Sequence, residues 1–423
     1  MHNKDKAIKQ YLQHYAEPEA QAVLKEFIWP GTYQHCILIP AFKESADLID
    51  RLVHIAEYSP ELLIILVVNR PDNYQDHTCN RLLIDRIFNL NVRQQASTNK
   101  HNNQFHLLKL NSRSDLLYID RGQNYPPIPH KQGVGLARKI GADIAAALIN
   151  QDIIKDQWIN CTDADTLIPN DYFANISAID AKYYAAIVHP FSHVSTNQET
   201  ISLPMKLYEQ RLHQYVNGLR WADSPYAHHT LGSCISSSLI HYCHVRGYPK
   251  RSGAEDFYFL NKLRKSGEIL QHQMHEMKII SRHSDRVPFG TGPAVTRLAN
   301  CTNPEAEKIF YHPKCFEALK LWLEWAPELY KKEIPNSEKL LTEQLNTYKK
   351  NEISSVLASA LFTINFDQGI KHCKKQSKSQ KKFNRHLLNW FDGFKTLKLI
   401  HYMRDHGYPN INIVTLSRIS SFY

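Results

Sequence analysis

The chain has 423 residues and a formal net charge of +10, with 43% hydrophobic and 22% charged residues. This composition is typical of a globular protein with about two or three domains, and no apolar run approaches the roughly 20 residues that a membrane helix needs. The positive charge favours acidic partners such as nucleotides, phospholipid surfaces or nucleic acid, without choosing among them.

The first two hundred residues alternate between two patterns. After a polar N-terminal helical arm, residues 1–30, short apolar runs at 35–40, 62–69 and 158–161 predict buried strands. Helical spacing lies between them and is clearest in the alanine-rich stretch 133–149. Such alternation predicts a parallel α/β sheet with helices on both faces, in which ligands bind beyond the carboxyl ends of the strands.

Other parts of the chain follow different patterns. Residues 93–131 are expected to be loop-rich, with one short strand inside. After Ile201 helical patterns dominate, and from about residue 303 the chain is expected to be mostly helical without a site motif.

Cysteine usage and the N-terminus indicate the compartment. Eight cysteines are scattered without a C-x-x-C pair, and the first residues show neither an apolar core nor a small-residue cleavage site. A chain this long does not need disulfides for stability. We therefore expect reduced thiols, no secretory signal and a cytoplasmic protein.

Two carboxylates follow the predicted strand at 158–161. Asp163 and Asp165 are separated by one residue, so an extended turn can aim both at one point. Mg²⁺ and Mn²⁺ prefer oxygen ligands and usually bind through a few carboxylates together with substrate phosphates. The pair therefore predicts a Mn²⁺ or Mg²⁺ site that serves the departure of a pyrophosphate-type group. Taken alone, the same pair also fits a solvated turn.

Further motifs lie on both sides of this pair, in a fixed order. They are "ILIPAFKES", "VVNRPDN", "KQGVGLARKIGADIA", "CTDADT" and the long block "TLGSCISSSLIHYCHVRGYPKRSGAEDFYFLNKLRKSGEI". Together they resemble a GT-A-fold, family 2-type glycosyltransferase over about residues 35–290. The third motif is particularly similar to polypeptide N-acetylgalactosaminyltransferases. Lys43 stands where the family usually has asparagine.

The resemblance implies a fold and a reaction. The implied fold is an α/β, Rossmann-like mixed sheet of the nucleotide-diphospho-sugar transferases over 31–302. The mostly helical extension expected over 303–423 is not covered by the resemblance. The nucleotide-sugar half spans about 31–166 and the acceptor half about 167–302. The implied activity moves a sugar from a nucleotide-diphosphate-sugar to an acceptor hydroxyl of a glycan, a lipid-linked molecule or a small molecule. Inversion at the anomeric carbon is expected, and retention stays open.

The resemblance also assigns residues on the donor side of the site. Pro40, Ala41 and Glu44 would face the base and ribose of the nucleotide, and Asn69 would contact the base. Arg138 would reach either the diphosphate or the loop that carries the acidic pair, because guanidinium donates to phosphate and carboxylate in a fixed fork.

The metal and the acceptor side receive the remaining assignments. Asp163 would touch the ribose or sugar side of the metal site and Asp165 would ligate the metal. Gly232 would let the backbone approach the donor sugar. Asp256, with Glu255, would be the general base for the acceptor hydroxyl.

Residues 283–292 complete the assignments. His283 would be a late metal ligand, although a surface or core histidine fits as well in a chain with 23 histidines. Gly290 and Gly292 in the stretch that follows would be hinges of a lid, or part of a plain loop.

Blander explanations exist for single residues. Glu255 and Asp256 also fit a favourable charge pair at a helix N-terminus, and Arg138 fits a solvated helix position. A dinucleotide site at Gly133–Arg138 lacks its preceding strand and its third glycine. The histidines and cysteines at 228–244 fit no usual zinc spacing.

A basic segment suggests a further partner. No acid lies between Asp367 and Asp392, and this stretch contains Lys371, Lys374, Lys375, Lys378, Lys381, Lys382 and Arg385. Apolar residues at helical spacing follow, so the segment predicts either peripheral contact with an anionic membrane at its inner face or a solvated linker before a core helix. A membrane-surface or nucleic-acid binder on a catalytically degenerate transferase scaffold is the alternative to an enzyme; nucleic acid is not expected as a partner of the enzyme.

Overall fold

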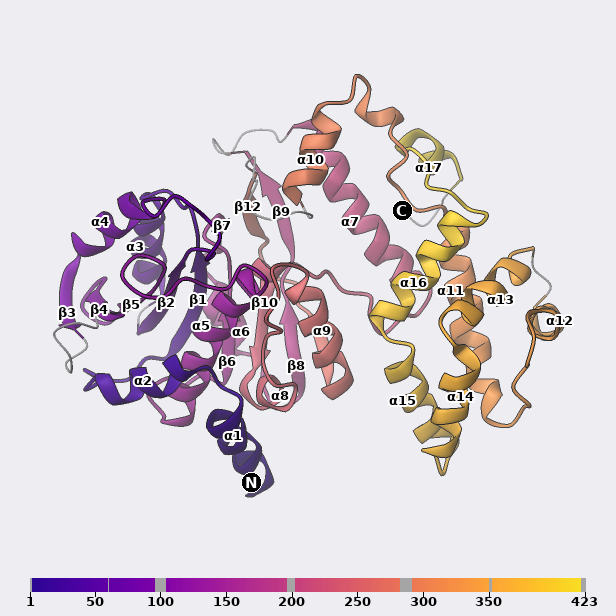
Figure 1. Cartoon of the computed structure of the whole chain (residues 1–423), viewed down its shortest axis with the longest axis horizontal. Coiled ribbons are helices and arrows are strands. Elements are labelled where there is room, and N and C mark those ends of the chain that lie inside the picture. The colour runs from indigo at the N-terminus through magenta and orange to yellow at the C-terminus, as the bar shows by residue number, and fades with distance from the viewer. Residues whose placement is uncertain are drawn as a thin grey trace. The chain divides into compact units, whose positions relative to one another are not determined.

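The computed structural model of the chain divides into two compact units (Figure 1). Unit 1 contains residues 1–201 and 230–289, and unit 2 contains residues 202–229 and 290–423. The residues that the structure describes are 2–59, 61–95, 104–195, 202–281, 291–349 and 352–419. Each unit is therefore built from two separate stretches of chain, a division that the sequence did not indicate.

Unit 1 is built around a nine-stranded mixed sheet with the order β11-β8-β10-β6-β1-β2-β5-β4-β3. Its strands are β1 (His35–Ala41), β2 (Leu62–Asn69), β3 (Asn91–Gln95), β4 (Phe105–Lys109), β5 (Asp115–Arg121), β6 (Trp158–Cys161), β8 (Tyr184–Val188), β10 (Ile235–Ser238) and β11 (Glu268–Gln271). Strands β5, β2, β1 and β6 are parallel, and β10 runs antiparallel to both of its neighbours, β6 and β8. The predicted α/β sheet is thus confirmed. The short strand expected within 93–131 is confirmed as β4, whereas β5 was not predicted.

The path of the chain reverses beside β1. It runs from β1 to β2 and on to β5, and then returns to β6, which pairs with β1 on the opposite side. In open α/β sheets ligands bind beyond the carboxyl ends of the strands at such a reversal. The segments that follow Ala41 and Cys161 leave the sheet at this point.

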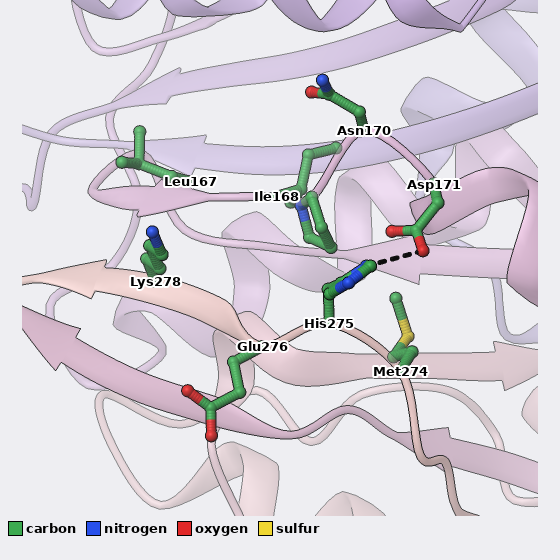
Figure 2. A pocket seen from close by; sticks show the side chains of 9 residues that line it. Leu167, Ile168, Asn170, Asp171, Met274, His275, Glu276 and Lys278 are labelled. Carbon is green, nitrogen blue, oxygen red and sulfur yellow. Dashed lines mark hydrogen bonds and ion pairs between the residues drawn. The ribbon is translucent and has the colours of Figure 1, made fainter.

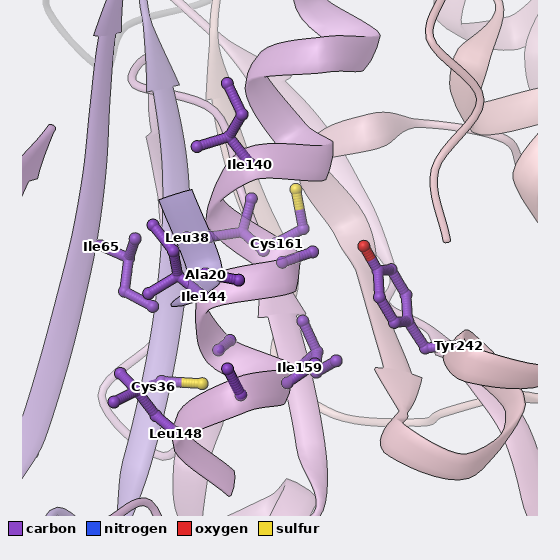
Figure 3. Close-up of a cluster of buried hydrophobic side chains, with 14 of the residues drawn as sticks. Ala20, Cys36, Leu38, Ile65, Ile140, Ile144, Leu148, Ile159, Cys161 and Tyr242 are labelled. Carbon is purple, nitrogen blue, oxygen red and sulfur yellow. The ribbon is translucent and has the colours of Figure 1, made fainter. Parts of the chain in front are cut away.

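Helices pack on this sheet because its central strands are apolar on both faces. Every residue of β1 and β2 is buried, as expected for parallel strands that are covered on both sides. Helix α5 (Gly133–Asn150) packs against them through Ile140, Ile144 and Leu148 (Figure 3). A Cβ on Gly141 would lie 3.2 Å from the Cβ of Leu38, so small residues on this helix permit its close approach.

The other helices of unit 1 surround the same sheet. They are α1 (His2–His14), α2 (Pro18–Glu26), α3 (Leu48–Tyr58), α4 (Arg81–Phe88), α6 (Tyr172–Ser177), α8 (Leu239–His244), α9 (Glu255–Ser266) and the short 3₁₀ helix η1 (Gly232–Cys234). A small second sheet has the order β7-β12-β9, from β7 (Thr166–Leu167), β12 (Met277–Ile280) and β9 (Phe191–Val194).

The N-terminal helices are joined to unit 1 by a buried polar network. The Nζ of Lys139 on α5 donates to the Oδ2 of Asp143 at 2.6 Å and to the hydroxyl of Tyr11 at 2.8 Å. The hydroxyls of Tyr11 and Tyr242 both donate to Asp143, and the backbone N–H of Glu17 does so at 2.8 Å. Burial raises the pKa of Asp143, while the charge of Lys139 and these donors act in the opposite direction. The predicted arm is therefore fixed against α5 and α8.

Unit 2 is helical in its described residues, as predicted for the C-terminal region. Its elements are α7 (Leu203–Trp221), α10 (Thr291–Ala299), η2 (Pro304–Ala306), α11 (Pro313–Trp325), η3 (Ala326–Tyr330), α12 (Glu338–Tyr348), α13 (Ser354–Thr363), α14 (Phe366–Lys375), α15 (Gln380–Trp390), α16 (Gly393–Asp405) and α17 (Ile413–Ile419). Gly218 on α7 faces the ring of Phe316 on α11, where a Cβ would have no room. Among the described helices, none combines the length and apolarity needed to cross a bilayer.

We expect Asp143→Asn to lower the free energy of unfolding by about 3–5 kcal/mol, because Lys139 would keep a buried charge that has lost its partner. Chemical denaturation of the full chain measures this loss. Asp85→Asn is the control, because Asp85 pairs with Arg81 on the exposed face of α4, and such pairs contribute about 0–1 kcal/mol. Equal effects of the two substitutions would contradict the structural role of the network.

Candidate functional site

The predicted nucleotide-side residues lie where β1 and β2 end. Pro40 and Ala41 are buried in the last two positions of β1. The side-chain amide of Asn69 donates to the backbone oxygens of Ala41 at 3.1 Å and Val67 at 3.3 Å. Asn69 is only 6% exposed. This amide group therefore joins the ends of two strands.

The turn after β1 has an unusual backbone. Lys43 has a φ of 55°, in the left-handed region that asparagine tolerates better than lysine. The backbone N–H of Lys43 donates to Asn80 Oδ1 at 2.9 Å, and the next residue, Glu44, is buried. Asparagine would therefore adopt this turn with less backbone strain than lysine does.

The acidic turn after β6 is held by its backbone. Arg51 of α3 donates through Nη2 to the Ala164 oxygen at 2.8 Å, and the Ile280 N–H of β12 donates to the Asp165 backbone oxygen at 2.8 Å. The side chains of Asp163 and Asp165 on either side are half-buried. Helix α3 and the small sheet thus fix the turn that carries both carboxylates.

The Arg138 guanidinium connects this turn to three other segments. Its Nη2 donates to Asp163 Oδ1 at 2.7 Å and its Nε to Glu255 Oε1 at 3.0 Å. Its Nη1 donates to the Cys161 sulfur at 2.9 Å and to the Gly232 oxygen at 3.1 Å. The Arg138 side chain is only 4% exposed. Of the two predicted roles for Arg138, the structure shows the contact with the acidic loop. The alternative prediction, that Arg138 is a solvent-exposed helix residue, is wrong.

Charge keeps this arginine protonated despite its burial. Burial by itself would lower the pKa of Arg138, but the charges of Asp163 and Glu255 contribute to a pKa well above the ordinary value. Burial also raises the pKa of the Cys161 thiol to about 11, so the thiol meets the guanidinium in its neutral form. A buried cation with two carboxylate partners is an ion-pair network whose members depend on one another.

Glycines make room for this arrangement. A Cβ on Gly232 would lie 2.3 Å from Nη2 of Arg138, so the guanidinium itself requires glycine there. The prediction connected Gly232 with the donor sugar; the observed close neighbour is Arg138. At the start of α5, Gly133 has a φ of 43° and Gly135 donates its N–H to the Arg251 oxygen at 3.0 Å. These glycines pack against the chain's own loop before α9, which leaves the dinucleotide-site interpretation of this motif without support.

The two acids at the start of α9 differ in their surroundings. Glu255 is buried and bound to Arg138, whereas the adjacent Asp256 is half-buried and accepts the Phe257 N–H at 2.6 Å. Burial and the neighbouring charge of Glu255 raise the pKa of Asp256 to about 7. A pKa of about 7 suits Asp256 for proton transfer near neutral pH. Glu255 instead holds Arg138.

A surface hollow adjoins the acidic turn along the chain. It has a volume of about 780 Å³ and is lined by residues 167–171 and by Met274, His275, Glu276 and Lys278 (Figure 2). His275 and Asp171 form an ion pair of 2.8 Å across it when the imidazole is protonated. Leu167, which lines the hollow, belongs to β7 and follows Asp165 by two residues.

The described residues contain no group of three or more histidine, cysteine, aspartate or glutamate side chains arranged to hold a metal ion. The predicted ligand His283 and the predicted hinge Gly290 lie outside the described residues, whereas Gly292 lies in the first turn of α10. Of the predicted metal ligands, Asp163 and Asp165 are the ones the structure describes. The carboxylate of Asp163 is engaged by Arg138.

The chain has no match among models of known protein families or among curated proteins. The assignment of a function therefore depends on the geometry of unit 1 and on the motifs that resemble the transferase family.

Sequence reasoning missed several residues of the site. Arg51 gave no motif signal, although it holds the turn between the two aspartates. Asn80 fixes the Lys43 backbone and donates to the Asn69 oxygen at 2.9 Å. Cys161 received no predicted role, although it lies in the predicted strand 158–161 and in the motif "CTDADT". Their roles come from partners that are far away in the sequence.

We expect Gly232→Ala to destabilise the chain by about 1–3 kcal/mol, because the new methyl group overlaps the guanidinium of Arg138 and must displace it. Thermal and chemical unfolding measure the loss. Gly31→Ala is the matched control, since a Cβ at Gly31 would meet nothing within 4 Å, and it should change stability by less than about 0.5 kcal/mol. A Gly232→Ala variant as stable as the control would contradict the packing described.

Proposed function

We propose that the chain is a metal-dependent glycosyltransferase with a GT-A fold, similar to family 2, that transfers a sugar from a nucleotide-diphosphate-sugar to an acceptor hydroxyl. The observation that carries the proposal is the connection that Arg138 makes between the acidic turn after β6 and the two acids at the start of α9. It brings together the two motifs to which the resemblance assigns donor binding and proton transfer, at an edge of the sheet where α/β proteins bind ligands.

The architecture supports the same proposal. The resemblance implies a Rossmann-like mixed sheet, and unit 1 has a mixed sheet in which β10 is reversed next to β6. The nucleotide half would use the ends of β1 and β2, and the acidic turn would follow β6.

The acidic turn also fits a metal that arrives with a nucleotide. Mg²⁺ and Mn²⁺ commonly take one or two protein carboxylates and complete their coordination with phosphates and water. Asp165, with the remaining oxygen of Asp163, supplies such a set of hard ligands, and His283 is proposed as a further ligand. When bound, the metal would neutralise the charge that develops on the departing diphosphate.

Side chains of the chain would carry out proton transfer and keep the acidic segments in position. Asp256 would accept the proton of the acceptor hydroxyl, while the hydroxyl oxygen forms the new bond to the anomeric carbon. The bond from that carbon to the diphosphate breaks, and its electron pair leaves with the diphosphate. Asp163 and Glu255, bound to Arg138, would keep the two acidic segments in register. In this inverting scheme Asp256 is the only proton acceptor that the proposal needs.

We expect the transfer rate to rise with pH through about 7, because Asp256 acts as a base only after it loses the proton that its raised pKa retains. Asp256→Asn should remove this dependence and reduce turnover by at least about 100-fold. Initial rates measured against pH test both points. A mild loss in the Asn variant would instead indicate a retaining reaction.

The raised pKa of Asp256 also affects the stability of the protein, which can be measured without substrate. Between pH of about 4 and about 7 the folded protein retains a proton on Asp256 that the unfolded chain has lost. The folded state binds more protons in this window, so the contribution of Asp256 to stability falls as pH rises to about 7 and then stays constant. The stability of Asp256→Asn relative to the native chain should therefore increase over this window, and an unchanged difference would contradict the raised pKa.

Donor binding gives the direct test of the function. A thermal-shift screen of nucleotide diphosphates and their sugars, with and without Mn²⁺, should find a ligand that raises the melting temperature only when the metal is present. Asp165→Asn should abolish that shift. Asp85→Asn, on an exposed helix of the same unit, should keep the shift. A screen without any metal-dependent shift would overturn the proposal.

A further inference from the structure

Helices α14 and α15 of unit 2 and the connection between them carry a basic surface. The exposed cations that define this surface are Lys371, Lys375, Lys378, Lys381, Lys382 and Arg385. We propose that it binds anionic phospholipid at a membrane surface. This inference goes beyond the proposed transferase activity and does not depend on it.

The apolar faces of the two helices point away from solvent. Ile370 and Cys373 of α14, and Phe383 and Leu387 of α15, are buried in the core of unit 2. The prediction that this segment inserts an apolar helix face into a membrane is therefore not supported by the fold, because that face is already covered. The charges remain, on a rigid helical pair instead of a flexible linker.

Few acids compensate this charge. No aspartate or glutamate lies in the sequence between Asp367 and Asp392. Asp367 pairs with Lys371 at 3.4 Å, and Glu328 on the neighbouring η3 pairs with its own Lys332 at 3.6 Å. The positive charges at 375–385 are therefore mostly not neutralised by nearby acids and can interact with an anionic partner.

The position of two of the lysines is unfavourable for the helix itself. Lys381 and Lys382 stand in the first turn of α15, which has no acid there. The N-terminus of a helix carries partial positive charge and disfavours cations. An external anionic surface would offset this charge repulsion. The two lysines at this helix end therefore favour an anionic partner.

Phospholipid fits this surface better than nucleic acid does. Clusters of about four to eight lysines and arginines on a helical surface bind anionic headgroups without a fixed geometry. Single-stranded nucleic acid needs exposed aromatic rings for stacking, whereas Phe366 and Phe383 on these helices are fully buried and the partly buried Trp390 packs against Gly369. The surface is also dominated by lysine, which acts as a point charge, and has a single arginine for forked recognition.

The test is co-sedimentation of the full chain with vesicles at physiological ionic strength. Vesicles of equal parts phosphatidylglycerol and phosphatidylcholine should bind the chain, vesicles of phosphatidylcholine alone should not, and added salt should release it. Because one lysine near an anionic surface contributes about fivefold in affinity, Lys381→Glu with Lys382→Glu should weaken binding by at least about 25-fold. The same variant should melt at a higher temperature, since acids favour a helix N-terminus, so a loss of binding would not reflect unfolding.

The matched control replaces two exposed lysines elsewhere in unit 2 by glutamate, which reverses their charges. Lys339 occupies the second position of α12, as Lys381 does in α15, and Lys308 lies outside any helix. Lys308→Glu with Lys339→Glu has the same net charge as the test variant and should bind vesicles nearly as well as the native chain. The proposal would be overturned if the native chain did not bind the vesicles, or if both variants lost vesicle binding equally. It would also be overturned if the test variant lost binding only to duplex or single-stranded DNA in a parallel assay.

Discussion

The structure of the candidate site depends on one buried cation. Arg138 lies almost entirely out of water, and burying a charge is costly unless good partners surround it. Its partners come from β6, the acidic turn, η1 and the first turn of α9, so these four segments must be correctly placed together. Helix α5, which carries Arg138, is in turn fixed by close glycine contacts at its start and by the hydrogen bonds that Tyr11 of α1 and Tyr242 of α8 donate to Asp143.

This arrangement separates structural carboxylates from those that the proposal assigns to chemistry. Asp163 and Glu255 both bind Arg138, and each keeps its segment in position. Asp165, two residues after Asp163, and Asp256, directly after Glu255, are the carboxylates proposed for the metal and for the proton. Because Glu255 is charged beside Asp256, it also contributes to the raised pKa of the proposed base. The group that fixes the geometry thus helps to set the reactivity.

The sequence predicted what depends on local pattern. The runs of β1, β2 and β6 and the alanine-rich α5 were recognisable because buried parallel strands and their helices are apolar throughout. Strand β5 was missed because its apolar centre is short and lies between Asp115 and Asp120 in a turn-rich region. Nothing local shows that α7 belongs to unit 2, or that Gly232 makes room for a guanidinium 94 residues away in the chain. Such features depend on contacts that only the folded chain creates.

We propose that the turn after β6 binds a metal-bound nucleotide while Arg138 keeps the turn in place. Anomalous diffraction at the manganese edge, from crystals grown with Mn²⁺ and a nucleotide diphosphate, measures this directly. The account predicts a manganese peak at the Asp165 carboxylate, with Arg138 still bound to Asp163 and Glu255. A peak elsewhere, or an Arg138 side chain turned away from both carboxylates toward the phosphates, would contradict it.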